Sequence, residues 1–347
     1  MKAAYITAPG PAESIRFGEL PQPEPRPGEV LIRVHAVAVN PIDTYIRAGM
    51  VKMNLPVPFI VGCDLAGVVE AVGSDCRQFR AGDRVWCSNQ GLFGRQGTFA
   101  EFACVEARWL NATPAGVRDE DAAAVSLVGI TAHLGLFAKA RLQAGETVFV
   151  NGGAGGVGSM VVQLAKAAGA RVIATASTEA KRAALLNNGA HHALPADAQA
   201  LPSRVKALCP RGGVDVVFDP VGGDLFDASL RCAALHARLL VIGFAAGRIP
   251  QVPTNLVLVK NLAILGFNYG QYIGWGLTDE RTTHEEDVRE VLSTLTSAMA
   301  RTDMPLPVTQ HFPVSQWLEA IDTTMGRRSV GKVILDFDKI PFKGDTA

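Results

Sequence analysis

A glycine-rich stretch is the first place in this sequence where residue types and their spacing indicate chemistry. Residues 148–177 read VFVNGGAGGVGSMVVQLAKAAGARVIATAS, an apolar run, a cluster of glycines and a second apolar run. Gly153, Gly155 and Gly158 fit the pattern G-x-G-x-x-G between a predicted strand and a predicted helix. In that pattern the glycines permit a tight turn, a close approach of the backbone to a pyrophosphate, and close packing of helix on strand.

The phosphates of a dinucleotide would lie at the start of the predicted helix, where unpaired N–H groups favour an anion. A glycine-rich turn that binds nothing is the alternative, and the strands and helix in sequence around the loop argue against it. We predict that the dinucleotide-binding loop consists of Gly153, Ala154, Gly155, Gly156, Val157 and Gly158.

The residues after the second apolar run indicate which dinucleotide is preferred. A site for NAD usually has Asp or Glu about 20 residues past the loop, where it holds the ribose hydroxyls. Residues 173–177 here are Ile, Ala, Thr, Ala and Ser, with no carboxylate, and Lys181 and Arg182 follow. Hydroxyl and cationic groups suit a 2′-phosphate. We therefore predict NADPH, held in part by Ser177 and Lys181, although Arg182 can equally belong to a solvated helix face.

Charge and composition exclude several other classes of protein. Lysines and arginines number 33 against 33 aspartates and glutamates, so no basic surplus exists to drive binding to nucleic acid or to an anionic membrane. The longest apolar runs fall short of the roughly 18 residues of a spanning helix, and the first residues lack the apolar block of a signal peptide. We expect a cytoplasmic protein whose partner is a small molecule.

The six cysteines do not form a metal-binding or redox pattern. They are Cys63, Cys76, Cys87, Cys104, Cys209 and Cys232, and no two are closer than eleven residues. A zinc ribbon or a redox site needs a pair of cysteines with about two residues between them. We expect buried free thiols and no bound metal.

The pattern of elements predicts an α/β protein with two domains. Short apolar segments separated by Pro and Gly clusters make residues 1–110 β-rich, and residues 119–140 read as helical. From residue 147 strand-like and helix-like segments alternate as in βαβ units, which indicates a doubly wound parallel sheet of the Rossmann type. After residue 268 two amphipathic helices and a final strand, GKVILDF, are expected to return to the first module.

Several motifs together resemble one known superfamily. They are VHAVAVNPIDTYIRAG at 34–49, PFIVGCDLAGVVEAVG at 58–73, FRAGDRV at 79–85, GTFAEFA at 97–103, AGETVFVNGGAGGVG at 144–158 and GKVIL at 331–335. The chain resembles the medium-chain dehydrogenase/reductase superfamily and, within it, the zinc-free quinone oxidoreductases related to zeta-crystallin. The resemblance implies a GroES-like catalytic domain at 1–125 and 268–347 and a Rossmann NADPH-binding domain at 126–267.

The resemblance also bears on the catalytic metal. Zinc-dependent members of the superfamily have a Cys where this chain has Asn40 and a His where it has Cys63, and their third ligand position falls near Leu127. A catalytic zinc needs about three protein ligands. The cysteine-rich lobe that holds a structural zinc in those relatives is absent as well. We therefore expect chemistry that needs no zinc.

By the same resemblance, Asn40, Asp43, Tyr45 and Thr131 line the substrate cleft. Asn40 would donate to the substrate or to the nicotinamide ribose, and Tyr45 would hydrogen-bond the carbonyl oxygen of the acceptor. We assign Asn40, Tyr45 and Thr131 as the catalytic residues. Alternatively, Asn40 caps a helix, Tyr45 is a packing residue, and Asp43 accepts hydrogen bonds from backbone N–H groups.

The resemblance completes the cofactor site with residues from other segments. They are Gly243 and Phe244 beside the nicotinamide, Phe267 and Asn268 at the carboxamide, and Arg327 near the adenine phosphate. The following segment, with Tyr269, Tyr272 and Trp275, forms either an aromatic wall of the acceptor pocket or a dimer contact.

A nicotinamide can reduce an acceptor that is already electrophilic without help from a metal. We therefore expect an NADPH-dependent, zinc-independent quinone oxidoreductase, and by resemblance a homodimer that pairs through its cofactor domains. The segments VPTNLVLV and LAILGF are predicted to be strands that could extend a sheet across the two-fold axis. A reductase of enones or 2-alkenals would use the same residues, and a non-catalytic NADPH-binding protein is the third alternative.

Overall fold

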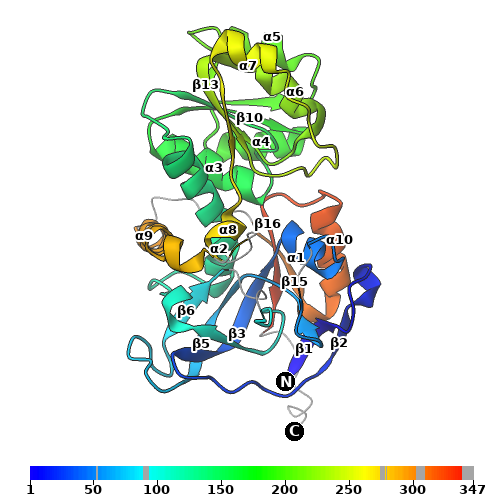
Figure 1. Cartoon of the computed structure of the whole chain (residues 1–347), viewed down its shortest axis with the longest axis vertical. Coiled ribbons are helices and arrows are strands. Elements are labelled where there is room, and N and C mark those ends of the chain that lie inside the picture. The colour runs from blue at the N-terminus through cyan, green and yellow to red at the C-terminus, as the bar shows by residue number, and fades with distance from the viewer. Residues whose placement is uncertain (52–53, 89–93, 274–277, 279, 302–308, 338–347) are drawn as a thin grey trace. The chain divides into compact units, whose positions relative to one another are not determined.

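The computed structural model describes the chain except for residues 52–53, 89–93, 274–277, 279, 302–308 and 338–347. It divides into two compact units (Figure 1). Unit 1 comprises Met1–Leu127 and Gly270–Ala347, and unit 2 comprises Val128–Tyr269. These bounds lie two residues from the boundaries at 125/126 and 267/268 that the resemblance implies. Unit 2 is thus a continuous insertion in the chain of unit 1.

Unit 2 is built on a six-stranded sheet in which every strand is parallel to its neighbours, as predicted. Its order is β11-β10-β9-β12-β13-β14. Helices lie against the sheet on both faces (Figure 1). The strands are β9 (Thr147–Val150), β10 (Arg171–Ala176), β11 (His192–Pro195), β12 (Val214–Asp219), β13 (Ala233–Val241) and β14 (Ala263–Gly266).

The central strands of this sheet are apolar on both faces, because helices cover both of them. All four residues of β9 are buried, and Phe149 packs with Ile173 of β10 and Val217 of β12 in the core. The order of strands reverses direction between β9 and β12, which is the topological switch point where open α/β sheets bind ligands. The helices are α3 (Gly156–Ala167), α4 (Glu179–Asn187), α5 (Leu201–Leu208), α6 (Gly223–Cys232) and α7 (Thr254–Lys260).

One element of unit 2 differs from expectation. The apolar run VPTNLVLV at residues 252–259 reads as a strand in the sequence, but Thr254–Lys260 forms the helix α7. Pro253 precedes the helix and Asn261 ends it in the left-handed conformation, with φ of 50°. A short apolar run has too few residues to distinguish the helical period from the strand period.

Unit 1 contains two sheets and confirms the β-rich module. The larger has the order β15-β16-β3-β5-β6-β8 with β7 also paired to β3, and the smaller has the order β2-β1-β4. The strands are β1 (Lys2–Ile6), β2 (Arg16–Glu19), β3 (Glu29–Val39), β4 (Phe59–Ile60), β5 (Leu65–Val72), β6 (Arg84–Cys87), β7 (Phe102–Glu106), β8 (Asn111–Ala112), β15 (Thr309–Pro313) and β16 (Lys332–Asp336).

The C-terminal strand β16 lies inside the larger sheet, between β15 and β3. All five of its residues are buried. The predicted return of the C-terminal segment to the first module is therefore confirmed. Short 3₁₀ turns occur at η1 (Ala12–Ser14), η2 (Ala107–Trp109) and η4 (Val314–Gln316), and the helices are α1 (Pro41–Arg47), α9 (Arg281–Ala300) and α10 (Trp317–Met325).

Two helices carry the chain from one unit to the other. They are α2 (Asp119–His133), which continues as the π-helical segment η3 (Leu134–Lys139), and α8 (Tyr269–Tyr272). Among the described residues, Asp119–Lys139 is long and apolar enough to cross a membrane, but 78% of its most apolar window is buried inside the protein. A buried core helix has the same composition, so the segment is weak evidence for a membrane span.

Candidate active site

The predicted glycine loop connects β9 to α3 at the switch point of the unit 2 sheet. Thr175 of β10 fixes the loop, because its hydroxyl accepts the N–H of Gly152 at 3.1 Å and its carbonyl accepts the N–H of Gly153 at 2.9 Å. Gly155 is the N-cap of α3 and brings no side chain to the helix start. The first turn of α3 contains no acidic residue.

Two glycines of the loop serve different purposes. A Cβ on Gly158 would overlap the carbonyl of Gly152 and come within 2.7 Å of the Cα of Gly153, so this glycine is required for close packing of helix on strand. A Cβ on Gly155 would meet nothing closer than 3.5 Å. The space beside Gly155 is therefore open, and the first N–H groups of α3 have no acceptor within the helix. These features fit the pyrophosphate of a dinucleotide.

A buried polar network holds the two strands at the switch point. Asn151 follows β9, and its amide donates to Asp219 Oδ2 and to Ser229 Oγ, both at 2.9 Å. Asp219 ends β12, and its Oδ1 accepts the N–H groups of Val221 and Gly222 at 2.6 and 2.8 Å. Burial raises the pKa of Asp219, although these hydrogen bonds oppose the shift. The network shapes the ends of β9 and β12, and sequence reasoning missed it.

The residues predicted to select NADPH lie at the end of β10. Ser177 is exposed and Lys181 is half-buried in the first turn of α4. Thr178 caps α4 by accepting the N–H of Lys181 at 3.3 Å. Burial lowers the pKa of Lys181. The structure thus brings Ser177 and Lys181 together at the edge where the glycine loop also lies.

The remaining predicted cofactor residues of unit 2 follow the next two strands. Gly243 and Phe244 come after β13, and the Phe244 side chain is 39% exposed. Phe267 is buried after β14, and its N–H donates to the carbonyl of Val241, whereas Asn268 is exposed. Thr131 lies on α2 and is 6% exposed.

In unit 1, Asn40 is the N-cap of α1 and is fully buried. Its backbone N–H donates to Asp43 Oδ2 at 2.8 Å, which is half of a capping box. Its side-chain nitrogen donates to Ala38 O at 3.1 Å and to Asp64 Oδ2 at 2.9 Å. Both hydrogens of the amide are therefore used within the protein. In this arrangement Asn40 positions its neighbours, and direct contact with a substrate remains a prediction.

The oxygen of the Asn40 amide has a partner that the sequence did not reveal. Lys332, the first residue of β16, is 3% exposed. Its ammonium donates to Asn40 Oδ1 at 2.6 Å and to Val39 O at 3.1 Å, and it lies 3.9 Å from Asp64 Oδ2. Burial lowers the pKa of Lys332 and raises that of Asp64, and the charge of each partner opposes the shift of the other.

A second carboxyl group and a thiol complete this buried cluster. The Cys63 thiol donates to Asp43, and both side chains are buried. Burial raises the pKa of Asp43 to about 7, helped by the nearby Asp64 and opposed by Lys332. Burial and the neighbouring Asp43 raise the pKa of Cys63. The Leu127 backbone N–H donates to Asp64. Asn40, Cys63 and Leu127, the three positions that the resemblance matches to zinc ligands, therefore all contact this cluster.

Tyr45 lies on α1 one turn after the capping box and is half-buried. Its hydroxyl makes no hydrogen bond to a residue that the structure describes. It is therefore available to a ligand. Asp43, in contrast, is occupied as the acceptor that its structural interpretation predicted.

The last of the predicted site residues are those of the aromatic segment and Arg327. Tyr269 and Tyr272 are each 6% exposed, and the ring of Tyr272 stacks on His284 with 4.0 Å between centroids. One face of Tyr272 is thus covered by protein, and Trp275 lies outside the described residues. Arg327 is exposed after α10 with φ of 54°.

Comparison with known proteins identifies two family models that match this chain. A model described as alcohol dehydrogenase GroES-like domain matches residues 26–115, and one described as zinc-binding dehydrogenase matches residues 156–296. A quinone oxidoreductase of Rattus norvegicus is 32% identical over 77% of this chain and 79% of its own length.

Two solved structures cover nearly the whole chain. A mycobacterial protein complexed with NADPH has a TM-score of 0.86 and 32% identity, over 97% of this chain and all of that one. The Escherichia coli quinone oxidoreductase complexed with NADPH has a TM-score of 0.85 and 27% identity over the same shares.

The chain also matches much longer proteins. It is 31% identical to a mycocerosic acid synthase-like polyketide synthase of Mycobacterium tuberculosis over 95% of this chain, and it spans 15% of that relative's length. The chain spans most of the length of the rat relative. This match, together with the GroES-like and Rossmann folds, establishes the family. This chain belongs to the quinone oxidoreductase-like family of the medium-chain dehydrogenase/reductase superfamily.

Proposed function

We propose that this protein is an NADPH-dependent oxidoreductase that transfers hydride to a quinone without zinc. The observation that carries the proposal is the glycine loop at the switch point, followed by a strand end that offers Ser177 and Lys181 in place of a carboxylate. The similar proteins complexed with NADPH support this cofactor. The quinone oxidoreductase names of relatives support the acceptor.

Each part of the cofactor has residues that suit it. The N-terminus of α3 would hold the pyrophosphate through backbone N–H groups, and Ser177 with Lys181 would hold the 2′-phosphate. Bound NADPH supplies a hydride from its nicotinamide ring. The protein's own task is then to orient the acceptor and to stabilise the oxyanion that forms on it.

Tyr45 is the residue suited to that task. Its hydroxyl has no partner among the described residues, and the capping box of Asn40 and Asp43 fixes the start of its helix. A phenolic O–H can donate a hydrogen bond to the acceptor oxygen as negative charge develops there.

The buried cluster supports the proposal that zinc takes no part. Asn40 replaces an ionisable ligand, and the ammonium of Lys332 already places a positive charge beside Asn40 and Asp64. The acceptor must then be electrophilic in itself, as a quinone or an enone is.

The test is steady-state oxidation of NADPH with naphthoquinones, enones and aldehydes, with metal content measured on the same sample. We expect quinones to give the highest kcat/KM, a lower KM for NADPH than for NADH, and activity that a chelator leaves unchanged. A rate advantage of about 100-fold for an enone, or about 2.7 kcal/mol in the transition state, would instead assign a conjugated-alkene reductase. NADPH binding without oxidation by any acceptor would indicate a non-catalytic protein.

Substitution of Tyr45 by Phe tests the residue itself. We expect kcat with a quinone to fall by about 100-fold, at the lower end of the range seen when one stabilising donor is removed, while KM for NADPH stays unchanged. The matched control is Tyr5→Phe on β1, which removes a hydroxyl from a strand of the smaller sheet. Unchanged turnover in Tyr45→Phe would exclude Tyr45 from the reaction.

A further inference from the structure

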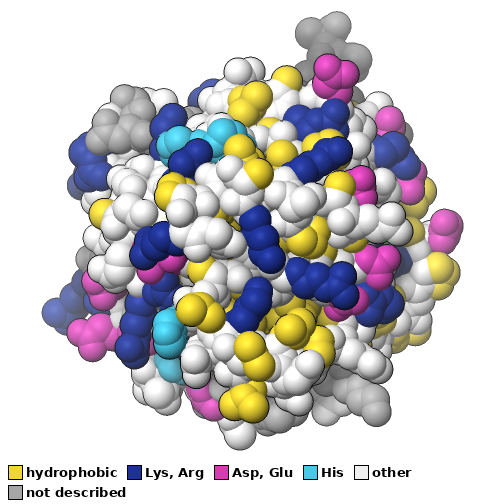
Figure 2. All heavy atoms as spheres, turned by 90° about the horizontal axis from the view of Figure 1, so that it is seen from above, with side chains coloured by type: hydrophobic (Ala, Val, Ile, Leu, Met, Phe, Trp, Pro, Cys, Tyr) yellow, Lys and Arg dark blue, Asp and Glu magenta, His cyan; other side chains and the backbone are white. Residues whose placement is uncertain are grey.

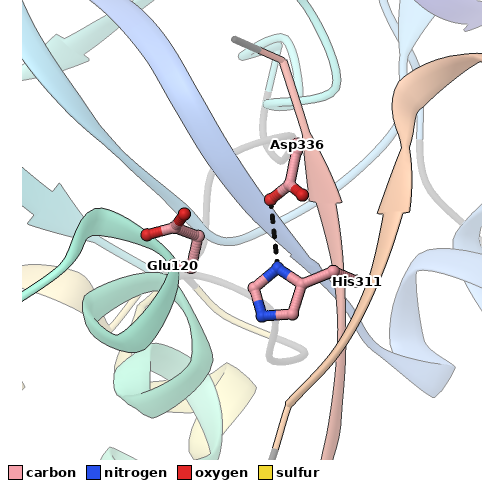
Figure 3. Close-up of side chains that lie close together, drawn as sticks. All are labelled: Glu120, His311 and Asp336. Atoms are coloured by element: carbon pink, nitrogen blue, oxygen red, sulfur yellow. Dashed lines mark hydrogen bonds and ion pairs between the residues drawn. The ribbon is translucent and has the colours of Figure 1, made fainter. Parts of the chain in front are cut away.

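A second group of polar side chains in unit 1 has the composition of a metal site. Glu120 of α2, His311 of β15 and Asp336 of β16 each offer one ligand atom, and these atoms all lie within 4.8 Å of one another. Figure 3 shows the three side chains, with His311 and Asp336 joined by a hydrogen bond and Glu120 beside them. None of the three takes part in the proposed reaction.

The charges around Glu120 are unevenly compensated. Three acidic residues form the first turn of α2. Asp119 pairs with Arg84 and with His35, and Asp121 accepts two hydrogen bonds of 2.8 Å from Arg118. Among the residues that the structure describes, Glu120 has no ion pair.

Asp336 adds a second carboxylate at the same place. Its side chain is 4% exposed, and its Oδ1 lies 3.2 Å from His311 Nδ1. The charges of Glu120 and Asp336 contribute to raising the pKa of Arg118, but the guanidinium of Arg118 donates its hydrogen bonds to Asp121. Two carboxylates therefore lie beside one imidazole, which is an arrangement that a divalent cation stabilises.

The Nε2 nitrogen of His311 has a hydrogen-bond partner of the kind that ligating histidines have in metal sites. Nε2 lies 2.8 Å from the Thr309 hydroxyl. A ligating histidine commonly donates its second N–H to an oxygen acceptor, which fixes the orientation of the ring. When a cation binds, it would replace the hydrogen bond between Nδ1 and Asp336. The ring proton would then sit on Nε2 and be donated to the Thr309 hydroxyl, and the lone pair of Nδ1 would face the cation.

We propose that Glu120, His311 and Asp336 bind a divalent first-row cation, with zinc as its best representative. One imidazole with two carboxylates is a donor set that suits zinc. Ligand atoms about 2.1 Å from an ion lie at most about 4.2 Å apart, so the 4.8 Å spread closes with a small rotation of the half-buried Glu120. Bound cation would tie the start of α2 to β15 and β16. This site is distinct from the active site and does not depend on the acceptor.

The experiment uses the full chain after treatment with a chelator and dialysis. Zinc binding is measured by calorimetry and by the rise of Tm with zinc concentration, and Co²⁺ is the spectroscopic probe. We expect visible d–d bands without a thiolate charge-transfer band, since the site contains no cysteine. Glu120→Gln and His311→Gln should each weaken zinc binding by about tenfold or more, and Thr309→Val by about 10-fold through the orientation of His311.

The matched control is His284→Gln on α9. His284 also lies beside two carboxylates, but Glu280 and Asp287 contact opposite ring nitrogens and cannot share one ion with it. This variant should bind zinc as the unaltered protein does. Absence of zinc binding, or equal binding by His311→Gln and the unaltered protein, would overturn the proposal. Circular dichroism of each variant without metal establishes that a loss of binding is not a loss of folding.

Discussion

Lys332 and Asp64 are the residues whose roles depend most on burial. Both side chains are ionisable and nearly inaccessible to solvent. The ammonium of Lys332 lies 3.9 Å from the carboxylate of Asp64. Removing one partner of such a pair leaves an uncompensated buried charge. We expect Lys332→Met to lower the free energy of unfolding by about 3–5 kcal/mol, as measured by urea denaturation.

The double variant Lys332→Met, Asp64→Asn should recover part of this loss, because it removes both charges while the amide that replaces the carboxylate can still accept from Asn40. Lys206→Met, on an exposed position of α5, is the matched control and should change stability by no more than about 0.5 kcal/mol. If the single and double variants are equally unstable, charge pairing is not what Lys332 contributes.

Asp43 makes stability depend on pH in an unusual direction. Its pKa is about 7 in the folded protein and about 3.8 without the fold, so between these values the folded state binds the extra proton. The contribution of Asp43 to the free energy of unfolding is fully present below pH 3.8 and is lost as pH rises through 7. At about 1.4 kcal/mol for each pKa unit, the upper limit is about 4 kcal/mol.

We expect Asp43→Asn to flatten the fall in unfolding free energy between about pH 5 and pH 8, measured by urea denaturation at both values. An Asn side chain still offers an oxygen to the N–H of Asn40. Asp75→Asn, at an exposed position, should leave the slope as it is in the unaltered protein. An equal slope in Asp43→Asn would show that Asp43 is ionised throughout.

The sequence reveals some of these residues and hides others. The glycine loop and the NPIDTY segment are local patterns, so their spacing alone predicts a loop and a capped helix. Lys332 appears in the sequence only as part of a strand motif, because its partners Asn40 and Asp64 lie far from it in the chain. A lysine inside an apolar strand and an aspartate after Cys63 are the available signals, and neither shows burial by itself.

At the scale of elements, the β9–α3 turn allows packing and binding to be tested separately. Gly155 has open space for a methyl group and a φ of −80°, whereas a methyl group on Gly158 would overlap the backbone. We expect Gly155→Ala to keep its Tm but to raise KM for NADPH by about tenfold or more, since the methyl group stands where the backbone approaches the phosphates.

Gly158→Ala should lower Tm, because helix and strand must move apart to admit the methyl group. Thermal unfolding and NADPH titration of both variants check this pair. Normal NADPH binding by Gly155→Ala would show that the phosphates do not lie beside Gly155. Helix α7 could not be predicted, because its short apolar run does not distinguish the helical period from the strand period.

At the scale of the whole molecule, we propose a homodimer formed through unit 2. Strand β14 is the edge of the sheet and pairs only with β13 among the described strands. Nearby, α7 exposes Leu258 and Val259 at 77% and 72%. Figure 2 looks onto unit 2 from the side that carries α5 and α7, where apolar side chains lie between lysines and arginines. A second copy would cover these side chains and continue the sheet.

We expect Leu258→Glu with Val259→Glu to convert a dimer to a monomer in light scattering, because two charges would be buried in the interface. Leu186→Glu on α4, where the side chain is 51% exposed, is the matched control and should remain dimeric. A monomeric unaltered protein at micromolar concentration would exclude the dimer.

The position of β16 inside the larger sheet has a consequence for the order in which the chain can fold during synthesis. Unit 2 is complete once Tyr269 has been made, and its parallel strands need no later residue. Strand β3, by contrast, cannot acquire its neighbour β16 until Asp336 has been made. Until then Asn40 and Asp64 lack the ammonium of Lys332. A ribosome-bound chain should therefore contain a protease-resistant unit 2 before the cluster around Asn40 can close.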